Sequence, residues 1–236
     1  MPELWVSDLG RVPYADALEI QRAVARDRIA GVIPEDVLLL VEHPPVVTLG
    51  RASKPGHLTA SSALLAARGV ELFEVERGGD VTFHGPGQLV GYPVIDLKRH
   101  RKDLHWYLRQ LEAALIDALH ELGIPAGTTP GLPGVWTDTE CDPRAPRKIA
   151  SIGVHARDWV TWHGFALNVT TDLSYFDLMV PCGITGVEMT SIARELGRTP
   201  DEGTVRDAVV GALAARFALT PRDWRAPIAE GVRAAG

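Results

Sequence analysis

The sequence predicts an α/β (α+β) protein in which helices flank a mixed, largely antiparallel sheet. Three observations lead to this fold class. Segments with strand character outnumber strongly periodic helices, many of them are joined by tight turns, and the chain has no repeat or low-complexity tract. Its 236 residues are enough to bury a substantial core, and we expect a single domain over residues 1–236.

The first half of the chain mixes strands with two helices. A proline at the start and a glycine at the end predict a helix over 13–31. A shorter helix is expected over 61–69, between a serine cap and a glycine stop. Strands are expected at 3–8, 36–43, 45–50, 70–76, about 80–84 and 88–96.

The second half contains the clearest helix, from Asp103 to Leu122. Asp103 can cap it, and its leucines recur at helical spacing and predict a core-facing stripe: Leu104, Leu108, Leu111, Leu115, Leu119 and Leu122. The stretch 124–147 is rich in proline and glycine, which predicts a mobile surface segment. A β-hairpin is expected over 148–169 with its turn near Arg157–Asp158, followed by short helices at 188–196 and 203–217.

Composition narrows the function classes. Hydrophobic residues make up 46% and charged residues 23%, as in a soluble globular protein, and the net charge of −6 argues against nucleic-acid or anionic-membrane binding. The longest apolar runs are too short to span a bilayer, and the N-terminus does not resemble a signal peptide, so we expect a cytoplasmic protein. Cys141 and Cys182 are too few for a zinc ribbon, and no metal is expected.

The stretch "RGGDVTFHGPGQLVGYP", residues 77–93, is the first that could carry chemistry. Its glycines allow sharp turns or the close approach of a ligand. Arg77, Thr82, His84 and Gln88 could bind a polar group, and the alternative is a hairpin with glycine turns. The stretch is neither a phosphate loop, since the chain has no G-K-[ST], nor a dinucleotide fingerprint, since a strand follows the glycines.

Three further stretches complete the candidate site. Lys148 opens "RKIASIGVH", where the alternative is a solvated lysine at a strand edge. In "WHGFALNV" the small residues Gly164 and Ala166 would leave space for a narrow apolar tunnel, or would mark a bulge. Cys182 in "PCG" is either a nucleophile or a small buried hydrophobe.

Taken together and in this order, "RGGDVTFHGPGQLVGYPVIDL", "RKIASIGV", "HGFALNV" and "PCGI" resemble the octanoyltransferases of lipoate biosynthesis. The resemblance is dense from about residue 43 to 195. It implies a single catalytic domain with a fold similar to biotin and lipoate protein ligases, with Cys182 as the acyl-accepting thiol and Lys148 beside it. It also implies an acyl pocket formed by Arg77, Gly78, Gly79, Asp80, Val81, Thr82, Phe83, His84, Ser151, Ile152, Gly153, Gly164, Phe165 and Ala166.

The resemblance implies the partners as well. The donor would be octanoyl-acyl carrier protein, and the acceptors would be lipoyl domains of 2-oxo acid dehydrogenase acyltransferase subunits and the glycine cleavage H protein. No cofactor is expected beyond the 4′-phosphopantetheine that arrives on the donor, and we expect a monomer. The chain departs from the family pattern in the insert "TDTECDPRAP", residues 137–146; Cys141 lies in it and no role is carried over to that residue.

The chemistry needs these residue types. Thioester exchange followed by amide formation is downhill without ATP, but a cysteine at its ordinary pKa is only a few per cent thiolate at pH 7. An ammonium about 4 Å away would favour the thiolate by up to about 4 kcal/mol at an effective dielectric near 20. Lys148 could then protonate the departing pantetheine thiolate and later accept a proton from the attacking amine.

Two other functions and a docking surface follow from the same sequence. An ATP-using ligase of this fold would need no nucleophilic cysteine, and a non-catalytic acyl- or lipoyl-domain-binding module would leave no thioester on Cys182. Because carrier proteins that deliver acyl chains are acidic, a positive patch is needed for docking. The dense basic run "KRHRK" at 98–102 is the first candidate, with Arg144, Arg147 and Arg157 as competitors.

Overall fold

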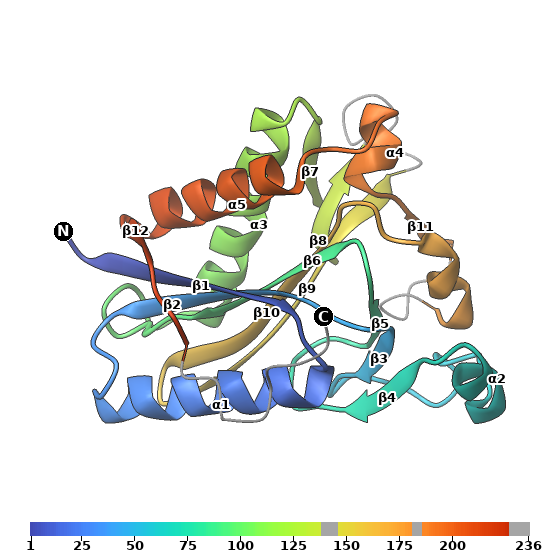
Figure 1. Ribbon diagram of the computed structural model, residues 1–236, viewed down its shortest axis with the longest axis horizontal. Helices are drawn as coiled ribbons and strands as arrows, with labels where there is room; N and C mark the ends of the chain where they lie inside the picture. Colours follow the sequence, from blue (N-terminus) through green and yellow to red (C-terminus); the bar gives the residue numbers. More distant parts are fainter. Residues whose placement is uncertain (138–145, 181–185, 227–236) are drawn as a thin grey trace.

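The structure is a computed structural model that describes residues 1–137, 146–180 and 186–226. Most strands join one large sheet in the order β12-β1-β2-β6-β10-β9-β8-β7, with β11 added beside β9 (Figure 1). These strands are β1 (Glu3–Arg11), β2 (Asp36–Glu42), β6 (Gln88–Val94), β7 (Ala126–Thr129), β8 (Leu132–Thr137), β9 (Arg147–Arg157), β10 (Val160–Asn168), β11 (Glu188–Met189) and β12 (Thr220–Asp223). The pairs β12–β1, β1–β2 and β11–β9 are parallel and the others are antiparallel.

A second, three-stranded sheet has the order β4-β3-β5. It consists of β3 (Val46–Leu49), β4 (Glu71–Glu74) and β5 (Val81–His84). The helices are α1 (Tyr14–Ala30), α2 (Ser62–Ala67), α3 (Leu104–Glu121), α4 (Ile192–Leu196) and α5 (Glu202–Phe217), with one 3₁₀ turn at Leu173–Leu178.

The large sheet is buried on both faces. Helices α3 and α5 cover one face and α1 lies along the other (Figure 1). In β2, Leu38 and Leu40 pack toward α3 and α5, whereas Leu39 and Val41 pack toward α1. The continuous apolar run of β2 therefore follows from the period of two in a strand that has helices on both sides.

The structure confirms the predicted fold class, a mixed α/β domain with a largely antiparallel sheet. Local signals placed several element ends correctly. The Asp103 side chain accepts a hydrogen bond from the Trp106 N–H at 3.0 Å, as a helix cap does, and Gly31 ends α1 with φ 76°. The hairpin turns at Asp158–Trp159, where φ is 52° and 65°, one residue later than expected.

Three sequence-based expectations were wrong. Leu104, at the first turn of α3, is 39% exposed, and Tyr107 is buried in the stripe instead. The proline- and glycine-rich stretch after α3 forms the antiparallel pair β7–β8 within 126–137. Residues 188–189 form a short strand on β9, and the helix starts only at Ile192. Over the described residues, no helix is long and apolar enough to cross a bilayer.

Candidate active site

A narrow pocket of about 90 Å³ lies where β9 and β10 face β5 and the segment before it. Its wall is formed by Tyr14, Arg77, Gly79, Asp80, Val81, Thr82, His84, Tyr92, Pro133, Lys148, Ser151, Ile152, Gly153, His163, Gly164, Phe165 and Ala166. Three of the four stretches that the sequence singled out meet here, and the fourth, which contains Cys182, lies outside the described residues. A larger cleft of about 370 Å³ beside β1, β2 and the start of α5 is lined by Gln88 but by none of the residues predicted for the acyl pocket.

Two residues of the predicted acyl pocket do not line it. Phe83 is buried in the core of the small sheet, where its ring stacks on Tyr175 with centroids 4.5 Å apart. This follows from strand alternation, which turns Thr82 and His84 toward the pocket and Phe83 away from it. Gly78 lies behind the wall, where its N–H donates to the Val154 carbonyl at 2.8 Å.

Lys148 is buried in this pocket with only 1% of its surface exposed. The alternative interpretation, a solvated lysine at a strand edge, is therefore wrong. Its main chain is covered on both sides, because it is the register partner of Trp136 in β8 and of Met189 in β11. Its Nζ lies 5.2 Å from the centroid of the Trp136 ring, which is a cation–π distance.

Cys182 and Cys141 lie in the segments 181–185 and 138–145, outside the described residues. The chain on either side of Cys182 is described. The Val180 N–H donates to the His57 carbonyl at 2.7 Å, and His57 Nδ1 lies 2.6 Å from an Asp80 carboxylate oxygen. On the other side the chain enters β11, whose Met189 pairs with Lys148. The flanks of the cysteine segment are thus attached to the pocket wall.

Arg77 and Gly153 bring the glycine-rich segment close to β9. The Arg77 guanidinium donates to the Thr48 carbonyl at 2.8 Å and to its hydroxyl at 2.9 Å, which fixes the segment to the small sheet. A Cβ on Gly153 would lie 2.7 Å from the Gly78 carbonyl oxygen, so only glycine permits this approach. The hairpin interpretation of 77–93 is wrong, because β5 and β6 belong to different sheets.

Gly164 allows a close contact between strands in addition to its expected place beside the pocket. A Cβ there would lie 2.1 Å from the Gly91 carbonyl oxygen of the neighbouring strand β6. The glycine therefore permits close strand packing, and it also lines the pocket. Ala166 lies on the pocket side of β10 and is buried.

His84 is held in one tautomer by a buried chain of hydrogen bonds. Asn168 Nδ2 donates to the Thr190 carbonyl at 3.0 Å, Gln88 Nε2 donates to Asn168 Oδ1 at 2.9 Å, and His84 Nδ1 is 2.9 Å from Gln88 Oε1. Because a carbonyl can only accept, the chain has one direction and Nδ1 must carry the proton. The lone pair of His84 is then on Nε2. Burial, His43 and Arg77 hold the pKa of His84 well below its usual range, so the ring is neutral.

Sequence reasoning missed Tyr14, Tyr92, Pro133 and His163 as wall residues. Tyr14 begins α1, and its ring stacks on His84 with centroids 6.0 Å apart. His163 stands next to Gly164 in a quoted motif, but strand alternation places its side chain on the opposite face. Its φ of 56° turns the ring back, and no sequence pattern signals that.

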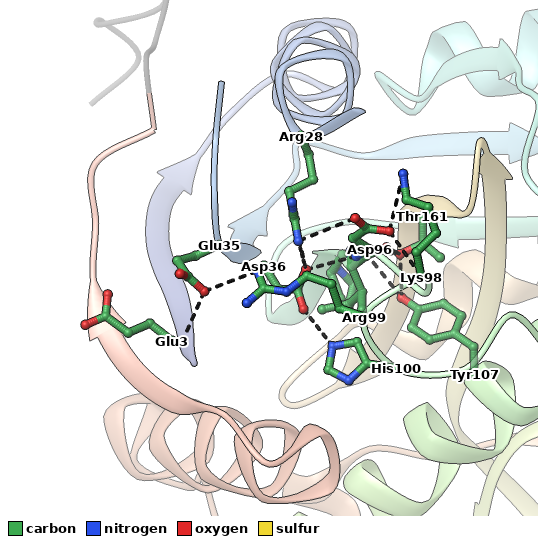
Figure 2. Close-up of polar contacts among 12 residues, drawn as sticks. Glu3, Arg28, Glu35, Asp36, Asp96, Lys98, Arg99, His100, Tyr107 and Thr161 are labelled. Atoms are coloured by element: carbon green, nitrogen blue, oxygen red, sulfur yellow. Dashed lines mark hydrogen bonds and ion pairs between the residues drawn. The ribbon is translucent and has the colours of Figure 1, made fainter. Parts of the chain in front are cut away.

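The basic run at 98–102 is largely neutralised by carboxylates. Figure 2 shows the side chains of Lys98, Arg99 and His100 turned toward acidic residues. The ion pairs are Lys98–Asp96 at 3.6 Å, Arg99–Glu35 at 3.4 Å, His100–Asp36 at 2.7 Å and Arg101–Asp103 at 3.2 Å. In the described part of the chain, Lys102 alone of this run has no carboxylate partner, so the run is not the free positive surface that its sequence indicates.

Arg147 is also paired, to Glu195 at 2.9 Å, which removes one competing docking candidate from the free surface. Arg157 is exposed beside Asp158 at 3.7 Å, and Arg144 lies outside the described residues. Among residues 1–137, 146–180 and 186–226, no three His, Cys, Asp or Glu side chains are grouped so that they could hold a metal ion.

Residues 13–214 match the family model of the lipoyl protein ligase A/B catalytic domain. The chain belongs to this family. Among its curated relatives are the octanoyltransferase of Koribacter versatilis, 53% identical over 82% of this chain and 76% of that protein, and the octanoyltransferase of Myxococcus xanthus, 49% identical over 92% of this chain. The Myxococcus protein is longer, and the match spans 60% of it. These relatives identify the octanoyltransferases, which are acyltransferases, as the branch of the family to which the chain is similar.

Solved structures confirm the expected fold relationship. A bi-partite lipoate protein ligase from Thermoplasma acidophilum superposes with a TM-score of 0.74 at 16% identity, covering 95% of this chain and 88% of that one. The biotin protein ligase of Aquifex aeolicus gives a TM-score of 0.50 at 13% identity, covering 92% and 70%. At these identities the likeness concerns the fold alone.

Proposed function

We propose that this protein transfers an octanoyl group from octanoyl-acyl carrier protein to a lysine of lipoyl domains, through a thioester on Cys182. The observation that carries the proposal is the burial of Lys148, the lysine predicted to accompany the thiol, in the pocket built from the predicted acyl-binding segments. The similarity to octanoyltransferases at 49–53% identity supports the same reaction. The lipoyl-domain acceptors, the cytoplasmic location and the monomeric state are part of the proposal.

In the first half-reaction the Cys182 thiolate attacks the donor thioester. The C–S bond to Cys182 forms, the bond to pantetheine breaks, and Lys148 gives its proton to the departing pantetheine thiolate. Before the attack, the Lys148 ammonium favours the thiolate form of the cysteine. Its burial strengthens this effect, because charges interact more strongly where water is excluded.

In the second half-reaction the acceptor lysine amine attacks the acyl-enzyme. The C–N bond forms, a proton leaves the amine nitrogen for neutral Lys148, and the Cys182 thiolate departs. Both steps balance without ATP, metal or another cofactor. The neutral His84 ring in the same pocket is the next group that could accept the amine proton.

Intact mass spectrometry tests the proposal directly. We expect incubation with octanoyl-acyl carrier protein, without ATP, to add one octanoyl mass that hydroxylamine removes. Cys182→Ser should abolish this adduct and lower turnover by orders of magnitude, whereas the matched variant Cys141→Ser should behave like the wild type. An adduct on Cys141, transfer that requires ATP, or acyl binding without a covalent adduct would each contradict the assignment.

A further inference from the structure

His84 turns an unused nitrogen toward the pocket. Its Nδ1 donates to Gln88 Oε1 at 2.9 Å, so the lone pair of the ring is on Nε2. Among residues 1–137, 146–180 and 186–226, nothing forms a hydrogen bond with Nε2. The nitrogen is still not one of the enclosed side-chain atoms without a partner, so it is open to the pocket that His84 lines. An acyl chain cannot donate to this lone pair, and its presence in the wall of an acyl pocket therefore needs another explanation.

Gln88 cannot turn over to release His84. Its Nε2 donates to the Phe83 carbonyl at 3.2 Å and to Asn168 Oδ1 at 2.9 Å, which leaves Oε1 facing the ring. Asn168 is fixed in turn, because its Nδ2 donates to the Thr190 carbonyl at 3.0 Å. Both routes end on backbone carbonyls, which can only accept. The proton of His84 is therefore held on Nδ1, and Nε2 stays free.

His84 lies at the same end of the pocket as Lys148. The hydrogen-bond chain attaches it to Asn168, the last residue of β10. Leu167, the residue before, pairs with Ala150, which is two positions from Lys148 along β9. Two positions span about 7 Å at about 3.4 Å per residue. A carbonyl that reacts beside Lys148 is therefore on the side of the pocket where His84 stands.

Transfer to an amine benefits from a neutral acceptor at this place, whereas thioester exchange does not. The acceptor lysine attacks as a neutral amine, and its nitrogen gains positive charge as its lone pair forms the C–N bond. Lys148 takes one of its two protons, and the other stays on the nitrogen of the amide product. A lone pair that accepts this second N–H directs the amine toward the carbonyl and stabilises the developing charge. A thiolate has no hydrogen to donate and gains nothing from the same nitrogen.

We propose that His84 Nε2 accepts this second N–H and orients the acceptor amine for attack on the acyl-enzyme. Gln88 and Asn168 are then positioning residues, because they hold the proton of the ring on Nδ1 and keep Nε2 free. Lys148 remains the group that takes the proton that leaves the amine. The inference rests on the proposed acyl transfer and concerns its second half-reaction alone.

The test measures how the octanoylated enzyme divides between an amine and a thiol. The full chain is loaded with octanoyl-acyl carrier protein, and the rate constants of transfer to a lipoyl domain and to free pantetheine are measured in single turnovers. We expect His84→Phe to lower the ratio of amine transfer to thiol transfer by about 10–100-fold, as for a hydrogen bond to a charged group. Gln88→Met should lower it by about threefold or more, because the proton can then occupy either nitrogen. The ¹⁵N spectrum of His84 in Gln88→Met should show this second tautomer.

His43→Phe is the matched control. His43 is another buried histidine, but its Nε2 is already engaged by the Tyr92 hydroxyl at 2.7 Å, and it does not line the pocket. Its replacement should leave the ratio of amine transfer to thiol transfer within about twofold of the wild type.

A ratio of two rate constants measured on the same acyl-enzyme does not depend on the fraction of folded protein, so a merely structural role would not change it. The inference is overturned if His84→Phe leaves the ratio unchanged. If His84→Phe does not fold, Gln88→Met decides in its place, and an unchanged ratio there overturns the inference. Failure of the wild type to form the acyl-enzyme would instead contradict the proposed function.

Discussion

Replacing Lys148 by methionine should separate the effect of this lysine on the free energy of unfolding from its effect on the rate of acyl transfer. The side chain is 1% exposed, and moving an ammonium from water into such a site costs several kcal/mol. The contact with Trp136 at 5.2 Å, one of the interactions of Lys148, recovers about 2 kcal/mol of this. Methionine has a similar shape and keeps a favourable contact with the ring. We therefore expect the free energy of unfolding of Lys148→Met to equal that of the wild type or to exceed it by up to about 2 kcal/mol.

Urea denaturation and thermal unfolding measure the stability arm. In a chain of this length each kcal/mol shifts Tm by about 2–4 °C, so the expected change is between zero and a rise of about 8 °C. Single-turnover experiments measure the catalytic arm, where both half-reactions should slow by about 10²–10⁴-fold. Lys102→Met is the matched control, since it removes an exposed lysine. It should change the free energy of unfolding, and the activation free energy of either half-reaction, by no more than about 0.5 kcal/mol. A loss of more than 2 kcal/mol of stability in Lys148→Met would refute the reasoning, because it would make Lys148 a structural residue.

Lys148→Arg extends the same experiment to proton transfer. Arginine keeps the charge but cannot lose its proton. The space is tight, since a Cβ on Gly134 would lie only 2.8 Å from Lys148 Cε. We expect some acyl-enzyme formation to survive and the transfer step to be lost far more severely. Transfer at nearly the normal rate would exclude Lys148 as the proton acceptor and would make His84 the next group to test.

Three further predictions follow. Reversal of charge at Arg99 and Arg101 to glutamate should leave the KM for acyl carrier protein within about twofold, because both side chains are already paired with carboxylates. A large rise in KM at low salt would restore the run as the docking surface. The ¹⁵N chemical shifts of the His84 ring should show a protonated Nδ1 and an unprotonated Nε2. His43, whose Nδ1 faces the Val12 carbonyl at 2.8 Å, is an internal reference for the same tautomer. A protonated Nε2 on His84 would contradict the chain of hydrogen bonds. Burial alone would raise the pKa of Asp36, but hydrogen bonds from His100 and the Asp96 N–H, together with Arg28, lower it. The stabilising effect of the Asp36 carboxylate is therefore present above about pH 4 and is lost as pH falls through the lowered pKa. In urea denaturation, the difference of about 3–5 kcal/mol in unfolding free energy between the wild type and Asp36→Asn should therefore shrink below about pH 4. A difference that stays constant with pH would contradict this.

Sequence predicted those features of the fold that local chemistry decides. Pro13, Gly31 and Asp103 each act within one helical turn, so the ends of α1 and the start of α3 could be located without knowing the rest of the chain. The strands β7 and β8 could not be located in this way. Their prolines and glycines are typical of a loop, and they become strands because Trp136 and Thr137 pair with the long strand β9.

The same distinction applies to the site. The motifs identified the segments that form the pocket, but not which side chains face it. Phe83 and His84 are adjacent, and only the direction of β5 turns one into the core and the other into the pocket. The basic run at 98–102 gave a misleading signal because its partners Glu35 and Asp36 are more than 60 positions away in sequence (Figure 2). Charge patches depend on tertiary pairing, which composition does not report.

Strand pairing also connects the buried Lys148 to the chain that follows the predicted nucleophile Cys182, 34 positions further along the sequence. The Lys148 carbonyl accepts the Thr190 N–H at 2.9 Å, and Thr190 follows β11 directly. Asn168 donates to the Thr190 carbonyl, and Gln88 connects Asn168 to His84. The backbone of Lys148, the backbone of Thr190 and the His84 ring are therefore connected by one set of hydrogen bonds. Such a set positions the groups of an acyl-transfer site relative to one another before substrate arrives, which lowers the cost of bringing them together in the transition state.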